Sequence, residues 1–66
     1  MNKTQANIIN ALYTGAKQYH ELFLESKAES SAEFHENLQI LILNKKITRR
    51  YITGAYYYVV NKENAK

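Results

Sequence analysis

The chain has 66 residues, a net charge of +3, and neither cysteine nor proline. A domain this short buries only about 60% of its unfolded surface, which argues against a large enclosed substrate cavity, and the lack of cysteine excludes disulfides and thiolate zinc sites. The longest apolar run, Ile40 to Leu43, is far shorter than the roughly twenty residues of a membrane span, so we expect a single cytoplasmic domain with no membrane contact.

Two helices are predicted in the amino-terminal part, at residues 5–14 and 17–26. Thr4 is the expected cap of the first helix, and Gly15 is expected to end it. The second helix places Lys17 four residues before Glu21, a spacing that pairs opposite charges on a helix surface. The apolar positions of these helices recur at helical spacing and are Ile8, Ile9, Leu12, Tyr13, Tyr19, Leu22 and Phe23.

A third helix is predicted at residues 31–44. Ser30 and Glu33 have the spacing of a capping box, in which a serine hydroxyl and a glutamate carboxylate bond the free amides of a helix start. The expected buried positions are Phe34, Leu38, Leu41 and Ile42. An alternative is that residues 38–43 form a strand, which would make the rest of the chain a three-stranded meander packed on two helices.

A β-hairpin is predicted at residues 47–60, with a polar tail at residues 61–66. Gly54-Ala55 suits a two-residue type II′ turn, which would place Tyr51 opposite Tyr58. Side chains alternate between two faces of the hairpin, and a shift of the pairing by two residues leaves the faces unchanged. One face carries Ile47, Arg49, Tyr51, Tyr56, Tyr58 and Val60, and the other carries Thr48, Arg50, Ile52, Tyr57 and Val59.

The first of these faces is the predicted core side. Its tyrosines are then buried, whereas Tyr57 on the second face is exposed, since aromatic side chains pack well on a pleated surface. Arg49 is the only charged residue of the core side. We expect it to lie over a tyrosine ring or to emerge at the rim of the sheet.

Three short helices followed by a hairpin resemble the winged helix-turn-helix superfamily. The resemblance is sharpest in "LQILILNKKI", where Leu38, Leu41 and Ile47 match the apolar residues that end the third helix and open the wing. Many members have a glycine in the turn where this chain has Lys45. The implied fold is an α+β winged helix with a carboxyl-terminal hairpin wing.

The resemblance implies a DNA-binding protein with an accessory or transcription-regulating role. In this superfamily the third helix enters the major groove and the wing contacts the backbone or the minor groove. The basic residues also gather at that end, because residues 45–66 hold six basic residues against one glutamate, whereas residues 1–44 hold three lysines against five glutamates. The implied DNA contacts are Lys45, Lys46, Arg49 and Arg50 of the wing region, with Ser31, His35, Asn37 and Gln39 of the third helix.

The outward face of the third helix suggests an alternative function. It carries Glu33, Glu36, Ile40 and Leu43, whereas a helix that reads a DNA groove normally presents basic or amide side chains. Exposed apolar residues on a small protein often mark a protein interface. The alternative is therefore a protein-binding adaptor or inhibitor, whose partner is a second copy of the chain or another protein.

No arrangement of residues for catalysis is recognisable. The chain lacks aspartate, cysteine and a glycine-rich phosphate loop, so we expect neither an enzyme nor a cofactor nor a small-molecule substrate. His20-Glu21 and His35-Glu36 lack the usual spacing of metal ligands. Tyr57 beside Arg50 could form a stacking platform for single-stranded nucleic acid, and Lys45 and Lys46 also have a simple role as cations at the negative end of a helix.

Overall fold

The computed structural model describes residues 1–61 as helices followed by a hairpin. The elements are α1 (Lys3–Tyr13), α2 (Tyr19–Ser26), α3 (Ser31–Leu43), β1 (Ile47–Ile52) and β2 (Ala55–Val60), with β1 and β2 antiparallel. The predicted α+β class and winged-helix-like layout are confirmed. Residues 38–43 belong to α3, so the alternative meander is wrong. Of the predicted polar tail, residues 62–66 lie outside the described residues.

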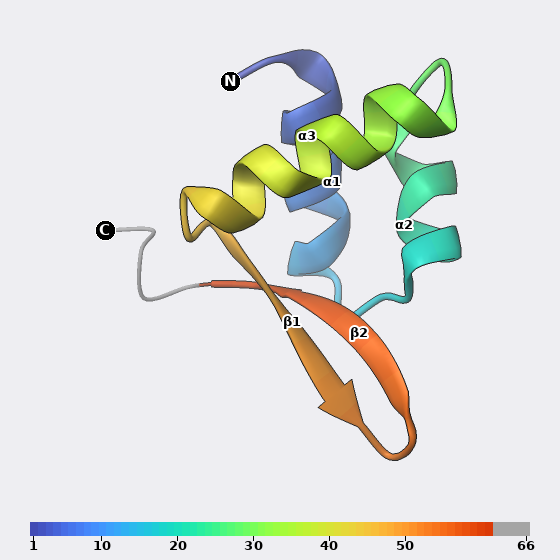
Figure 1. Cartoon of the computed structure of the whole chain (residues 1–66), viewed down its shortest axis with the longest axis vertical. Helices are drawn as coiled ribbons and strands as arrows, with labels where there is room; N and C mark the ends of the chain where they lie inside the picture. The colour runs from blue at the N-terminus through green and yellow to red at the C-terminus, as the bar shows by residue number, and fades with distance from the viewer. Residues whose placement is uncertain (62–66) are drawn as a thin grey trace.

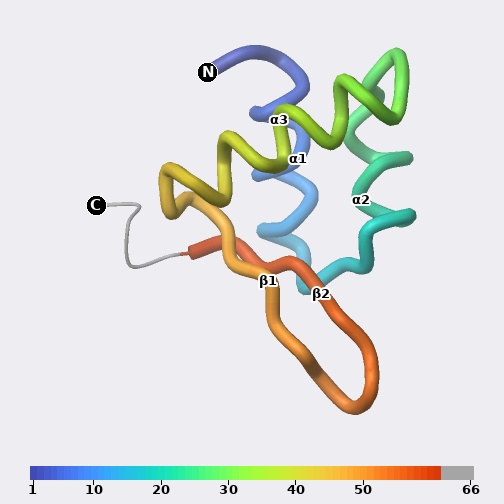
Figure 2. Tube along the Cα trace, in the orientation of Figure 1, coloured from blue at the N-terminus to red at the C-terminus, as the bar shows by residue number. Residues whose placement is uncertain are grey.

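The helices pack together at one end of the molecule, and the hairpin projects away from them (Figures 1 and 2). Phe34 of α3 is fully buried at the centre of the helical core, where its ring meets the rings of Tyr19 (4.9 Å) and Phe23 (5.4 Å) edge to face. Each helix and each strand contributes to the buried apolar core, which consists of Ile8, Ala11, Leu12, Leu22, Phe34, Leu38, Leu41, Ile47 and Tyr58.

The first helix starts two residues earlier than the predicted residue 5. Asn2 is its cap, because the Asn2 side chain accepts a hydrogen bond from the backbone amide of Gln5 at 2.8 Å. The prediction of Thr4 as the cap is therefore wrong. Thr4 lies inside the helix, where its buried hydroxyl donates to Glu33 Oε2 at 3.3 Å and so joins α1 to α3.

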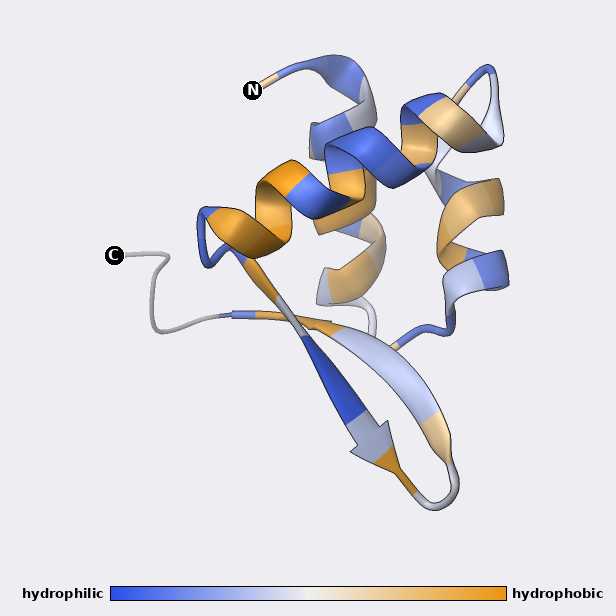
Figure 3. Cartoon of the chain, in the orientation of Figure 1, coloured by the Kyte–Doolittle hydropathy of each residue, from blue (hydrophilic) through white to orange (hydrophobic). Residues whose placement is uncertain are grey.

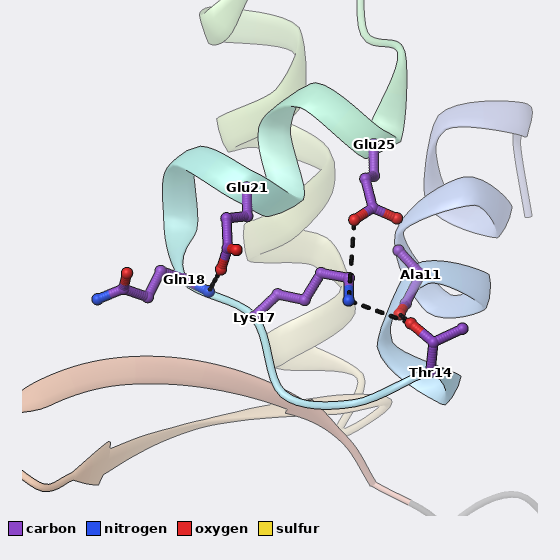
Figure 4. Close-up of polar contacts among 6 residues, drawn as sticks. All are labelled: Ala11, Thr14, Lys17, Gln18, Glu21 and Glu25. Carbon is purple, nitrogen blue, oxygen red and sulfur yellow. Dashed lines mark hydrogen bonds and ion pairs between the residues drawn. The ribbon is translucent and has the colours of Figure 1, made fainter.

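Lys17 is not part of the second helix, which begins at Tyr19. Lys17 is extended and exchanges two backbone hydrogen bonds with Tyr58 of β2, at 3.1 and 2.7 Å, so the α1–α2 connection forms a short bridge to the hairpin. Its side chain contacts Glu25 (3.7 Å) and Thr14 (3.1 Å) instead of the predicted Glu21 (Figure 4). Glu21 accepts from the Gln18 amide at the start of α2.

The third helix begins and ends close to its predicted limits. Ser30 Oγ accepts from the Glu33 amide (3.1 Å), while the Glu33 carboxylate bonds the amide of Glu29 (2.9 Å), one residue before the expected partner. Lys45 follows the helix in the left-handed conformation, with φ 61. A residue in this conformation commonly ends a helix and is usually glycine, so the chain makes the glycine-type turn with a lysine.

The hairpin spans residues 47–60 as predicted, but its loop is Thr53-Gly54 and not Gly54-Ala55. Both loop residues have positive φ, 45 and 89, which is the requirement of a type I′ turn. Tyr51 therefore pairs with Tyr56, and Arg49 pairs with Tyr58. The shift is two residues, so the assignment of side chains to the two faces is unchanged.

Candidate nucleic-acid interface

The basic residues of the hairpin region lie in the turn after α3 and on β1. Residues 44–61 contain four cations and no carboxylate side chain. Lys45, Lys46, Arg49 and Arg50 are all exposed, and β1 is the most hydrophilic part of the hairpin (Figure 3). Arg49 and Arg50 lie on opposite faces of β1 because they are adjacent in a strand. The projecting hairpin therefore carries positive charge on both faces.

The core side of the hairpin is buried only at its base. Ile47 and Tyr58 are buried against the helices, but Tyr51 and Tyr56, nearer the loop, are 66% and 54% exposed. The prediction that these two tyrosines are buried is wrong, because the outer half of the hairpin extends beyond the helices. Tyr57, predicted to be exposed, is half-buried.

Arg49, Tyr51 and Tyr56 form an exposed group that we call the tip cluster. The guanidinium carbon of Arg49 lies 4.7 Å from the centre of the Tyr56 ring, which confirms the expected stacking of Arg49 on a tyrosine. The rings of Tyr51 and Tyr56 pack edge to face with their centres 5.0 Å apart. The cluster holds one cation and two aromatic rings in contact at the surface.

An open groove of about 590 Å³ separates the end of α3 from the hairpin. Its floor includes the buried Ile47 and Tyr58, and its polar lining includes hydrogen-bond donors from both α3 and β1. The lining residues are Gln39, Ile42, Lys45, Ile47, Thr48, Arg49, Tyr58 and Asn61. Lysine, arginine and amide side chains commonly donate hydrogen bonds to phosphate oxygens. The groove contains all three types, so it has the chemistry of an anion site.

The predicted contacts on α3 divide into exposed and buried residues. Ser31, His35 and Gln39 are exposed, and Gln39 also lines the groove. Asn37 is only 5% exposed. Its Oδ1 accepts from the side chains of Asn2 (2.8 Å) and Gln5 (2.9 Å), and its Nδ2 donates to the Glu33 carbonyl at 2.9 Å. Asn37 thus joins α3 to the start of α1 and does not line the groove.

The four residues of the predicted protein interface also differ in exposure. Glu33 is half-buried, and its carboxylate bonds Thr4 and the Glu29 amide. Glu36 is exposed, and the apolar residues Ile40 and Leu43 are 40% and 78% exposed. The last two turns of α3 therefore present an acidic and apolar surface with no cation.

Two basic residues lie far from the hairpin. Lys3 and Lys27 border a second groove of about 320 Å³ that also contains Glu29 and Glu33. This groove lies where α1 begins and α2 ends, at the other end of the molecule (Figure 1). Carboxylates beside these lysines offset their charge, so this region is unlike the hairpin and provides a site for control substitutions.

Sequence reasoning missed the exposure of Tyr51 and Tyr56. The relevant signal was their distance from the base of the hairpin, because each strand residue adds about 3.3 Å. Tyr51 and Tyr56 lie two residues nearer the loop than the pair Arg49 and Tyr58. A face that is buried at Tyr58 can therefore be exposed one pair further along.

Residues 1–61 contain no group of three or more histidine or carboxylate side chains placed to bind a metal ion. Within the same residues no helix combines the length and apolar character that a membrane crossing requires. No protein family, curated protein or solved structure matches the chain.

Proposed function

We propose that this chain is a non-catalytic DNA-binding protein of the winged-helix type, which holds duplex DNA mainly through its hairpin. The observation that carries the proposal is the projecting hairpin region with four exposed cations and no carboxylate. A positive surface of this kind attracts the phosphate backbone and increases the rate of encounter. The helix–helix–helix–hairpin order and the left-handed turn at Lys45 agree with the superfamily resemblance.

The proposed contacts run from the groove to the hairpin. Lys45 and Arg49 line the groove, where they would hold a phosphate, and Lys46 and Arg50 extend the positive surface on either side. Ser31, His35 and Gln39 are the exposed polar residues of α3 that would add contacts to the same duplex. Asn37 is left out, because its amide is already bonded within the fold.

The third helix contributes less than the hairpin in this proposal. Its outer surface holds Glu36, Ile40 and Leu43, which offer neither positive charge nor donors to a groove. We therefore expect binding dominated by the phosphate backbone, with little dependence on base sequence. Such a protein would act as an accessory or transcription-regulating factor.

A titration of labelled duplex DNA at two salt concentrations tests the proposal. Four phosphate contacts predict a slope of about −3 to −4 in log K against log salt, so affinity should fall by about two orders of magnitude between about 50 and 200 mM salt. The double variant Arg49→Ala, Arg50→Ala should bind more weakly and reduce the slope by about 2.

The matched control is Lys3→Ala, Lys27→Ala, which removes the same charge at the other end of the molecule. It should retain most of the affinity. Equal losses in the two double variants would mean that net charge alone drives binding and that the hairpin is not the site.

The apolar end of α3 supports a second candidate function, binding of a protein partner. Ile40 and Leu43 are exposed apolar residues one turn apart on the same helix, and such residues often mark an interface. If they bind a second copy of the chain, Ile40→Ser, Leu43→Ser should convert a dimer to a monomer in a measurement of mass in solution. A wild-type chain that is monomeric at all concentrations would exclude self-association.

A further inference from the structure

Burial in the core does not explain the two exposed tyrosines of the tip cluster. Tyr51 and Tyr56 lie outside the buried core, although their neighbour Tyr58 belongs to it. Aromatic side chains stabilise a fold mainly when they are buried, and these two rings are exposed. In the projecting hairpin, Tyr56 contacts both Arg49 and Tyr51, and all three side chains are exposed.

The contacts within the cluster place two exposed aromatic rings beside a cation. Tyr56 is held on one side by the guanidinium of Arg49 (4.7 Å to the ring centre) and against Tyr51 by an edge-to-face contact (5.0 Å). Tyr51 is the more exposed of the two rings. A planar π-surface fixed beside a cation is the arrangement on which unpaired nucleic-acid bases stack.

The cluster is continuous with the proposed phosphate site. Arg49 both lines the groove at the end of α3 and contacts Tyr56. A phosphate bound in the groove would therefore bring the adjoining nucleotide close to the tip cluster. The absence of carboxylates from residues 44–61 favours a polyanion as the occupant of this surface over an acidic or a neutral one.

We propose that the tip cluster is a stacking site for an unpaired base of single-stranded nucleic acid. Tyr51 and Tyr56 supply the aromatic surface, and Arg49 supplies both the adjoining charge and the support of Tyr56. The proposal deepens the proposed DNA-binding function and rests on it for the phosphate contacts. It adds that single-stranded regions are bound through their bases as well as through their backbone.

The test compares two single-stranded probes of equal length and charge: an oligothymidylate and the same sugar-phosphate chain without bases. Electrostatic attraction alone gives both probes the same affinity, whereas stacking favours the thymidylate by about fivefold to a hundredfold per stacked base. Fluorescence anisotropy of an end-labelled probe at one fixed salt concentration gives the ratio. We expect the wild-type chain to prefer thymidylate.

Variants of the two tyrosines test whether Tyr51 and Tyr56 cause the preference for thymidylate. Tyr51→Leu, Tyr56→Leu removes both rings from exposed positions and should reduce the ratio of the two affinities to about 1, whereas Tyr51→Phe, Tyr56→Phe keeps the rings and should keep the ratio. The matched control is Tyr13→Leu, a change at the exposed tyrosine of α1, which should also keep it. Circular dichroism verifies that each variant is folded.

Three results would overturn the proposal: equal affinity of the wild type for the two probes, no measurable binding of either probe, or a preference that survives the double leucine change. The proposed function is judged separately by the salt-dependent titration of duplex DNA. Duplex binding with equal affinity for the two single-stranded probes would remove the stacking site alone. A thymidylate preference without duplex binding would remove the duplex function alone.

Discussion

Tyr58 and Tyr56 lie on the same face of the same strand, two residues apart, but they have opposite environments. Tyr58 is 7% exposed and belongs to the core, whereas Tyr56 is 54% exposed and its ring contacts Arg49 and Tyr51. Strand alternation assigns both side chains to one face. Whether that face is buried depends on how far the helices extend, so the base of the hairpin is structural and the tip is available for binding.

The largest expected effect on stability comes from removing the side chain of Tyr58, with Tyr56 as the comparison. Tyr58→Ala should lower the free energy of unfolding by about 3 to 5 kcal/mol, because it leaves a cavity in the core. Tyr56→Ala should cost about 1 kcal/mol or less, because it removes exposed contacts. Urea denaturation followed by circular dichroism measures both. Similar losses in the two variants would mean that the tip is as much a part of the core as the base.

The same contrast can be tested on α3 with two amide side chains. Asn37→Ala should cost about 1 to 3 kcal/mol, because Asn37 is buried and its loss leaves the amides of Asn2 and Gln5 without their acceptor. Gln39→Ala, an exposed change on the same helix, should stay within about 0.5 kcal/mol of the wild type. Thermal unfolding of the wild type and the two variants gives the comparison. If Asn37→Ala left the stability unchanged, that would contradict the buried hydrogen bonds between Asn37 and α1.

The loop of the hairpin allows a stabilising change. Thr53 has φ 45, which is unfavourable for a β-branched residue. Asn-Gly is the preferred sequence of a type I′ turn, so Thr53→Asn should stabilise the chain by about 0.5 to 1 kcal/mol. Thr48→Asn, within β1, should instead be neutral or destabilising. A higher midpoint in urea for the first variant alone is the expected result; a lower one would contradict the observed loop.

The smallest expected effect concerns the side chain of Lys17 at the base of the hairpin. Its ion pair with Glu25 has a separation of 3.7 Å and a half-exposed carboxylate, so Glu25→Gln should cost no more than about 0.5 kcal/mol. Glu36→Gln is the matched control, an exposed glutamate outside that pair. A loss above about 1 kcal/mol on Glu25→Gln would show that the ion pair, more than the backbone bridge to Tyr58, holds this connection.

Local rules predicted several features that depend on neighbouring residues, although they missed the Asn2 cap of α1 and the Thr53-Gly54 loop. The helix start at Ser30, the extent of α3 and the span of the hairpin follow from capping, periodicity and turn residues close in sequence. The faces of the hairpin were also predictable, because a shift by two residues does not alter them. In the turn after α3 this chain has Lys45 where many winged helices have a glycine. The backbone of Lys45 still takes the left-handed conformation that glycine usually adopts.

Three of the features that the sequence did not predict depend on contacts between distant residues. Lys17 fits a helical pattern with Glu21, but pairing with Tyr58 of β2 holds it extended. Asn37 has the side chain of a groove contact, but Asn2 and Gln5 reach it from α1. Thr4 fits a helix cap, yet it packs inside and bonds Glu33. In each case the deciding partner lies more than twelve positions away in the chain.

The sequence by itself determined the order of the elements, the two faces of the hairpin and the gathering of positive charge toward the carboxyl-terminal end, because these follow from local periodicity and composition. Only the tertiary structure decided which tyrosines are core and which form the tip cluster. The physical reason is that burial depends on how far the packed helices extend along the hairpin. They cover Tyr58 but leave Arg49, Tyr51 and Tyr56 exposed to solvent.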